Sequence, residues 1–428
     1  MPPPPMPEPT PLSPPSPRPT SLDPAQRRLG RRLAVLSHPA GMTHRNVFTD
    51  QLPTLALVGL GASEAWIGLQ RAFEPLSQLL QLPTLRAIGR FRKRRILVGG
   101  QVLAVLGGLP LVGYATLQQV GGGVALAIAL VSLWVTAVGI VISQTVWFPL
   151  LRSYVEPGRI GEFFGVLRTG WHLTLIAYFL GAQQWLAAHP GSFGPLFAVA
   201  TAAGVLRIVL IARLPDSAAT QPDERMRTRD VVALLRHRAP LRRYLAGMIL
   251  CGAPRRAALP FAVVMMRRSM GLSDADVVLT TVASFAGGFA SLYLWGRAVD
   301  RFGAAPVFRV TALASSVLLL GLAAVGPSAS LLAMIVFFFV FVALAAGFGV
   351  ADTHVLFGLA PEHEATPTLV IADVTTNLAY GAAPFLAGVA LDLLIGAGTD
   401  AIAAYRGLFV ISALAMALAP IPLRNFRR

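Results

Sequence analysis

The residues in this 428-residue chain that are best suited to chemistry are charged side chains inside long apolar stretches. Arg255 and Arg256 are adjacent in the stretch ILCGAPRRAALPF, residues 249–261. A charge near the bilayer centre costs about 2.5–3.5 kcal/mol on insertion scales, so such residues tend to face the interior of a helix bundle. Because a guanidinium pairs well with carboxylates and phosphates, one interpretation is a site for an anionic ligand. The other is internal pairing with acids of the same chain, namely Asp50, Glu74 or Asp373.

Pro254 directly precedes the arginine pair. A proline inside a helix removes a backbone donor and predicts a kink or an interruption. Interrupted helices near the bilayer midplane often form the substrate sites of transporters, which favours the ligand interpretation.

Other polar pairs recur at helical spacing in further apolar stretches. Asn46 and Asp50 are four residues apart and would share one helix face. They would line a cavity if the helix includes them, or lie at the membrane interface if the helix begins near residue 52. Arg71 and Glu74 are three residues apart, which fits either mutual neutralisation or a substrate clamp. The remaining candidates are Gln144, Arg168 with His172 as a proton carrier, and Asp373 with Asn377.

The composition indicates that membrane helices carry these residues. Hydrophobic residues make up 55% of the chain and charged residues only 13%, whereas soluble proteins contain about 25% charged residues. Runs such as 124–142 and 331–350 reach the roughly 20 apolar residues that cross a bilayer as a helix. We therefore expect an all-α polytopic membrane protein, with about twelve transmembrane helices in two six-helix bundles.

Charged residues between the apolar runs divide the chain into two similar halves. We expect a disordered proline-rich cytoplasmic tail at 1–40, an N-terminal bundle at 41–213, a cytoplasmic linker at 214–241 and a C-terminal bundle at 242–428. The expected spans are 41–62, 65–85, 95–118, 123–151, 162–186 and 193–213, then 242–266, 273–296, 306–325, 329–356, 367–394 and 402–423. Two sets of six spans predict the internal repeat of a transporter.

The arginines gather in alternate loops, and this bias predicts the orientation. Segments 90–95 and 213–243 are rich in arginine and fall on the same side as both termini, whereas segments 188–195 and 326–330 contain neither arginine nor lysine. Since cytoplasmic loops collect these residues, both termini are expected in the cytoplasm. The same bias explains the net charge of +16, so nucleic-acid binding is not expected. We expect a bacterial inner-membrane protein whose partners are the lipid bilayer and a small-molecule substrate; protein partners stay open.

One charged segment carries a family resemblance. GRAVDRFGAAPV, residues 296–307, resembles the Gly-x-x-x-Asp-Arg-x-Gly signature of the major facilitator superfamily of transporters. The residues of the motif are Gly296, Arg297, Asp300, Arg301 and Gly303. The resemblance implies two six-helix bundles that rock about a midplane site, with Asp300 locking neighbouring helices on the cytoplasmic side. The first-half segment GRFRKRR, residues 89–95, departs from the signature, because no acidic residue occurs between Glu74 and Glu156.

Several enzyme classes lack the residues that they would need here. Lys93 is the only lysine and lies in RKRR, which excludes a phosphate-binding loop that ends in Gly-Lys-Ser/Thr. The sequence contains no His-Glu-x-x-His motif, and Cys251 is its single cysteine. We expect no cofactor, no bound metal and no enzymatic activity.

The first functional hypothesis is a secondary active transporter that moves a small molecule by alternating access. An anionic or amphipathic solute, export and proton coupling through Asp50, Glu74 or Asp373 are the finer expectations. A second hypothesis is a non-transporting membrane sensor or assembly factor, suggested by the missing first-half acid and the arginine pair. A third is a lipid or pigment carrier.

Overall fold

The structure, a computed structural model, describes residues 22–81, 83–84, 91–151, 153–155, 160–215, 238–359, 365–424 and 426. These residues form helices and connecting turns, with no strand among them. The first half contains α1 (Pro24–Thr49), α2 (Gln51–Gly59), α3 (Glu64–Ser77), the 3-10 helix η1 (Gln78–Leu80), α5 (Lys93–Val112), α6 (Tyr114–Val120), α7 (Gly122–Leu151), α8 (Ile160–Ala188) and α9 (Gly194–Ala212). The second half contains α11 (Ala239–Arg268), α12 (Asp274–Phe302), α13 (Ala304–Val325), the 3-10 helix η3 (Gly326–Ser328), α14 (Leu331–Leu359), α15 (Ala365–Gly396), α16 (Ala401–Leu418) and α17 (Pro420–Leu423).

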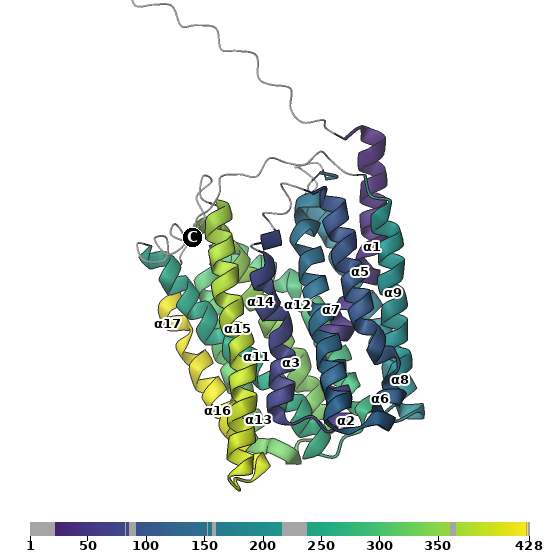
Figure 1. Cartoon of the computed structure of the whole chain (residues 1–428). Coiled ribbons are helices and arrows are strands. Elements are labelled where there is room, and N and C mark those ends of the chain that lie inside the picture. Colours follow the sequence, from purple (N-terminus) through teal and green to yellow (C-terminus); the bar gives the residue numbers. More distant parts are fainter. Residues whose placement is uncertain are drawn as a thin grey trace, which may run out of the picture.

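Ten of the described helices are long and apolar enough to cross a bilayer, which confirms the expected polytopic all-α protein. They are α5, α7, α8, α9 and α11 to α16. The first two expected spans correspond to α1 with α2 and to α3, which lie in the same bundle (Figure 1). Neither is among the ten, because the arginine-rich α1 lacks the hydropathy of a membrane-spanning helix and α3, with 14 residues, lacks the length.

The first helix begins earlier than the sequence analysis expects. The proposed tail reaches residue 40, but α1 starts at Pro24, so residues 24–40 are helical rather than disordered. The Asp23 side chain accepts a hydrogen bond from the backbone N–H of Gln26, and the Gln26 side chain accepts one from Asp23 N–H. This reciprocal cap, with proline at the first helical position, is a strong start signal. Residues 1–21 and most of the expected linker lie outside the described residues.

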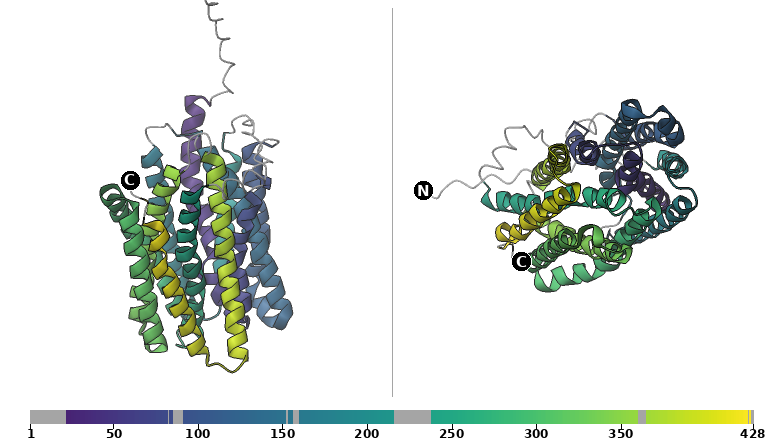
Figure 2. Two further views of the ribbon diagram at one scale, coloured as in Figure 1. Left: turned by 90° about the vertical axis from the view of Figure 1, so that its left-hand side faces the viewer. Right: turned by 90° about the horizontal axis from the view of Figure 1, so that it is seen from below.

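The two halves lie side by side and meet along two helix pairs. α3 packs along α15, and α8 packs along α12. The view along the bundle shows the first half, in purple and blue, beside the second half, in green and yellow (Figure 2). Each pair joins one helix of either half, so these two contacts must change if the halves rotate against each other.

Two glycines allow α3 and α15 to approach to backbone contact. A Cβ added at Gly68 would overlap the carbonyl group of Pro384, and a Cβ at Gly388 would lie 2.9 Å from the carbonyl carbon of Glu64. Larger side chains at either position would push the helices apart. The interface between the halves therefore depends on small residues, as is common where membrane helices pack closely.

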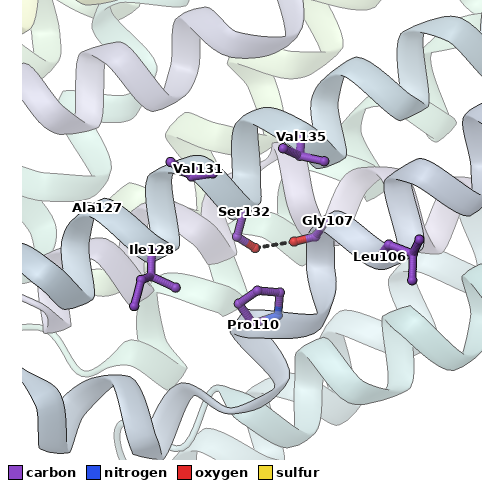
Figure 3. A pocket seen from close by; sticks show the side chains of 8 residues that line it. All are labelled: Leu106, Gly107, Pro110, Ala127, Ile128, Val131, Ser132 and Val135. Atoms are coloured by element: carbon purple, nitrogen blue, oxygen red, sulfur yellow. Dashed lines mark hydrogen bonds between the residues drawn. The ribbon is translucent and has the colours of Figure 1, made fainter.

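Glycine also sets the packing of α5 against α7 inside the first half. A Cβ at Gly100 would lie 2.6 Å from the backbone nitrogen of Ser143. Further along the same pair, the Ser132 hydroxyl donates to the Gly107 carbonyl oxygen beside a hollow of about 490 Å³ (Figure 3). Leu106 and Val131 line this hollow and are each 58% exposed, so it suits contact with lipid hydrocarbon.

Candidate functional site

A cavity of about 610 Å³ lies between the two halves. Helices α1, α3, α7 and α8 line it on one side, and α11, α14 and α15 on the other. Unlike the hollow between α5 and α7, it is lined by charged side chains, namely Arg45, Asp50, Arg71, Glu74, Arg255, Arg256 and Asp352. A cavity between bundles with a few convergent polar groups is a good candidate for a binding site. In the part of the chain that the structure describes, no group of three or more His, Cys, Asp or Glu side chains could hold a metal ion.

The first-half wall of the cavity is neutralised by two ion pairs. Arg45 donates from Nε to Oε1 of Glu74 at 3.0 Å, and Nη2 of Arg71 lies 3.7 Å from Oδ1 of Asp50. Of the two interpretations of Arg71 and Glu74, mutual neutralisation is therefore wrong, and a substrate clamp stays a prediction. Both α3 side chains reach across to the end of α1, where each meets an opposite charge, instead of turning toward one another along α3.

Arg71 also stabilises the junction between α1 and α2. Its Nη1 donates to the carbonyl oxygens of Thr49 and Asp50, both at 2.7 Å. Asp50 has the non-helical dihedral angles φ −100° and ψ −142° and separates the two helices. Asn46 lies in the last turn of α1, and both it and Asp50 line the cavity, so these two residues do not lie at the interface before a helix.

The second-half wall holds two arginines without a carboxylate partner. Among the described residues, neither Arg255 nor Arg256 has a carboxylate oxygen within 4 Å. The Arg255 guanidinium instead lies over Phe341 and Phe348, at 5.8 Å and 5.2 Å from the ring centroids. The Arg256 guanidinium lies 5.1 Å from the ring centroid of Tyr380. Aromatic faces attract cations but leave the N–H groups free to donate to a ligand.

The helix that carries these arginines is not interrupted at Pro254, and the expected kink stays a prediction. α11 runs unbroken from Ala239 to Arg268 with Pro254 and Pro260 inside it. Membrane helices tolerate proline because local adjustment and neighbouring groups satisfy the freed carbonyl. The arginine pair therefore reaches the cavity from the interior of a continuous helix.

Asp352 is a cavity residue that the sequence analysis missed. It lines the cavity near the end of α14 and accepts a hydrogen bond from the Tyr244 hydroxyl. Within the described residues no cation lies within 4 Å of its carboxylate. Asp352 is the single acid of α14, and an isolated acid in an apolar helix is the sequence feature that could have marked it as a functional residue.

The other candidates of the sequence analysis lie outside the cavity wall. His172 is buried where α8 meets α12, with its ring 3.5 Å from that of Trp171 and 5.5 Å from that of Phe289. Its Nδ1 bonds to the carbonyl oxygen of Arg168 at 2.8 Å, and the Arg168 side chain is exposed. Gln144 is half-buried in α7.

Asp373 and Asn377 satisfy one another within α15. The Asn377 side chain donates to Oδ1 of Asp373 at 2.8 Å and to its carbonyl oxygen at 2.9 Å. Neither residue lines the cavity. The structure thus brings together the candidates Asn46, Asp50, Arg71, Glu74, Arg255 and Arg256, and leaves out the other five.

No protein-family model and no curated protein matches this chain. Solved transporter structures nevertheless share its architecture. A bacterial homologue of the human lysosomal transporter Spinster, inward-facing and unoccupied, matches with a TM-score of 0.71 at 13% identity, over 94% of this chain and 98% of that chain. The nucleoside transporter NupG matches with a TM-score of 0.69 at 12% identity, over 94% and 100% of the two chains. A D-xylose–proton symporter matches with a TM-score of 0.65 at 16% identity, over 90% and 96%.

These matches cover nearly the whole length of each partner and include both bundles. The chain has the major facilitator fold. At such low identity the likeness establishes the arrangement of the helices and does not identify a substrate.

In this major facilitator fold, the signature segment is the end of a helix rather than a loop. α12 continues through Gly296 and Asp300 to Phe302, and Gly303 alone connects it to α13 with φ +82°, in the left-handed region that favours glycine. Asp300 is exposed, as are Arg297 and Arg301. Among the described residues Asp300 has no hydrogen-bond or ion-pair partner, so a lock formed by this residue stays a prediction.

The halves of the major facilitator fold are joined by hydrogen bonds at the opposite end of the bundle. The carboxylate of Asp392 in α15 accepts from the Ser63 hydroxyl at 2.6 Å and from the backbone nitrogens of Glu64 and Ala65, both at 3.0 Å. It thereby caps the start of α3, where the helix dipole favours a negative charge.

Glu64 extends the same connection. Its Oε1 accepts from the Tyr405 hydroxyl at 2.6 Å and also from Arg268, which donates in addition to the Ala62 carbonyl oxygen. Three helices of the second half thus bind one turn of the first half. The sequence analysis missed this network, because its partners are more than 200 residues apart and meet only in the folded protein.

Proposed function

We propose that the protein is a secondary active transporter that carries a small anionic molecule through the central cavity by alternating access. The major facilitator fold supports the transport class, because proteins with known transport activity share this fold. An anionic substrate is supported by the different pairing of the arginines on the two walls of the cavity. The two first-half arginines that line the cavity, Arg45 and Arg71, are paired with acids, whereas Arg255 and Arg256 have no carboxylate partner among the described residues.

The cavity also suggests the shape of the substrate. Its walls combine the two arginines with apolar and aromatic side chains, among them Phe73, Trp171 and Leu259. A carboxylate or phosphate group would bind at the arginines, while an apolar portion would contact these side chains. We propose an amphipathic organic anion, and export as the direction that suits a partly apolar substrate.

Proton coupling is best supported at Asp352. Asp50 and Glu74 each form an ion pair with an arginine, so protonation of either carboxylate would break that pair. Asp352 faces the same cavity with a tyrosine hydroxyl as its partner and no paired cation among the described residues. A carboxylate in this setting can exchange a proton without breaking an ion pair.

A binding screen tests the proposal directly. Thermal unfolding of the purified full chain is measured against a library of organic anions and matched neutral analogues, at pH 5.5 and pH 8. A ligand present at 100 times its Kd stabilises by about 2.7 kcal/mol, which is readily measured. The expected result is an anionic ligand whose stabilising effect is lost in Arg256→Gln and reduced in Arg255→Gln.

The control variant is Arg309→Gln, because Arg309 is exposed on α13 and does not line the cavity. It should bind the ligand as the unmodified chain does. Transport of the anion by proteoliposomes then establishes the activity, and the sign of an imposed gradient gives its direction. A folded protein that binds no anion, or that binds one but transports none, would contradict the proposal and favour a sensor or assembly factor.

A further inference from the structure

A second group of unpaired polar atoms lies inside the first half, away from the central cavity. Arg207 in α9 is only 5% exposed, yet it has no hydrogen-bond or ion-pair partner among the described residues, and its Nε is buried and unpaired. The Nε1 of Trp147 in α7 is likewise buried without a partner, as is Nδ1 of His38 in α1. None of these residues lines the cavity between the halves.

The Arg207 and His38 side chains both lie against the indole of Trp147. The guanidinium of Arg207 lies 5.1 Å from the ring centroid of Trp147. The His38 ring stacks on the same indole, with the centroids 5.8 Å apart and the planes inclined by 1°. Two of the groups, the arginine Nε–H and the tryptophan Nε1–H, can only donate a hydrogen bond. Their missing partner must therefore be an acceptor.

Four of the helices around this group supply no carboxylate, and the one acid of the neighbouring α8, Glu162, is exposed. α1, α5, α7 and α9 pack together in the first half, and none of them contains an aspartate or a glutamate between its first and last residue. A buried charge without a partner costs several kcal/mol, which aromatic contact offsets only in part. The same deficit of acids that leaves the first half without the signature aspartate thus leaves Arg207 without a counter-ion.

The packing around these groups limits the size of any partner. A Cβ at Gly41 in α1 would overlap the Arg207 guanidinium, and a Cβ at Gly204 in α9 would lie 2.6 Å from Cδ2 of His44. Any partner of these N–H donors must therefore be small.

We propose that Arg207, Trp147 and His38 form a binding site for a small monovalent anion such as chloride, held between α1, α7 and α9. The anion accepts hydrogen bonds from the arginine and the indole and neutralises the arginine charge. It stabilises the first half and is independent of the substrate in the central cavity.

The test measures thermal unfolding of the purified full chain while chloride replaces gluconate at constant ionic strength and pH. We expect the unfolding midpoint to rise with chloride and to saturate, since an anion at 100 times its Kd shifts the ratio of folded to unfolded protein about 100-fold. Arg207→Gln should abolish this dependence. Arg213→Gln is the matched control, because Arg213 is exposed at the end of the same helix.

Two further variants keep the result unambiguous. Trp147→Phe keeps an aromatic ring but removes the donor, so it should shift the chloride titration several-fold toward higher concentration even if Arg207→Gln fails to fold. Arg256→Gln should leave the chloride dependence unchanged, which separates this site from the cavity arginines. No chloride dependence in the unmodified chain would mean that water fills the site. That result, or a dependence that survives in both Arg207→Gln and Trp147→Phe, would overturn the proposal.

Discussion

Replacing Asp392 by alanine should open the end of the bundle at which the halves are joined. The carboxylate of Asp392 accepts three hydrogen bonds from the first turn of α3, and all three cross from one half to the other. The substitution removes these bonds and the charge that caps α3, while the packing of the halves elsewhere is unchanged. It should therefore destabilise the closed arrangement at this end more than the fold of either half.

The size of the effect follows from the contacts. A hydrogen bond to a charged group contributes about 1.5–3 kcal/mol when it is well buried. Asp392 is half-buried, so water can replace part of what is lost, and we expect about 2–3 kcal/mol for the three bonds together. Since every 1.4 kcal/mol is a factor of ten, the closed-to-open ratio should fall about 30- to 150-fold.

Thiol labelling of the cavity wall measures this shift. Cys251 is the only cysteine, so Cys251→Ser with Ala345→Cys places a single reporter on the cavity side of α14. A membrane-impermeant maleimide is added to reconstituted protein from the side that holds the turn between α15 and α16. If opening limits the reaction, labelling should accelerate in proportion to the open population.

The control is Asp400→Ala at the same end of the molecule. Asp400 caps α16 by accepting from the backbone nitrogen of Ala403 at 2.9 Å, a contact within the second half. This variant loses a helix cap but no bond between the halves, so its labelling rate should not change. Unchanged labelling in a folded Asp392→Ala protein, or equal acceleration in Asp400→Ala, would refute the reasoning.

Four further substitutions test other features of the structure. Gly99 faces open space, so Gly99→Ala should keep or slightly raise the unfolding midpoint. Gly100→Ala places a Cβ 2.6 Å from the backbone nitrogen of Ser143 and should lower the free energy of unfolding by about 1–3 kcal/mol. Equal unfolding midpoints for the two variants would contradict the close contact between α5 and α7. Asp300→Asn should lower the flux of the anion found in the binding screen without changing its thermal shift, and undiminished flux would count against a lock at this position. Asp352→Asn should abolish the dependence of flux on an imposed pH gradient but preserve exchange, and a retained dependence would place coupling elsewhere.

The helices and their order were predictable because hydropathy along the sequence is a local property. Ten of the twelve expected spans correspond to described helices that are long and apolar enough to cross a membrane. The boundary of the tail was wrong because it was placed from apolar content alone. The capping signal at Asp23, Pro24 and Gln26 was readable, but it precedes an arginine-rich segment that lacks the hydropathy of a span.

The pairing of charges was not predictable to the same degree. Spacing along α3 made Arg71 and Glu74 partners, but the position of α1 beside α3 gives each a different partner. The network around Asp392 depends likewise on which helices meet across the halves. These charge pairs depend on which helices are neighbours in the folded protein, and the spacing of residues along one sequence does not reveal those neighbours.

The unequal pairing of charges in the cavity has an evolutionary consequence. On the first-half wall a change at Arg45, Glu74, Asp50 or Arg71 would leave a charge unpaired in the membrane, so these positions can change only in pairs. Arg255 and Arg256 have no carboxylate partner among the described residues, so a single substitution at either position leaves no acid unpaired. The anion selectivity that we propose for α11 would therefore diverge through single substitutions, whereas the opposite wall can change only through paired ones.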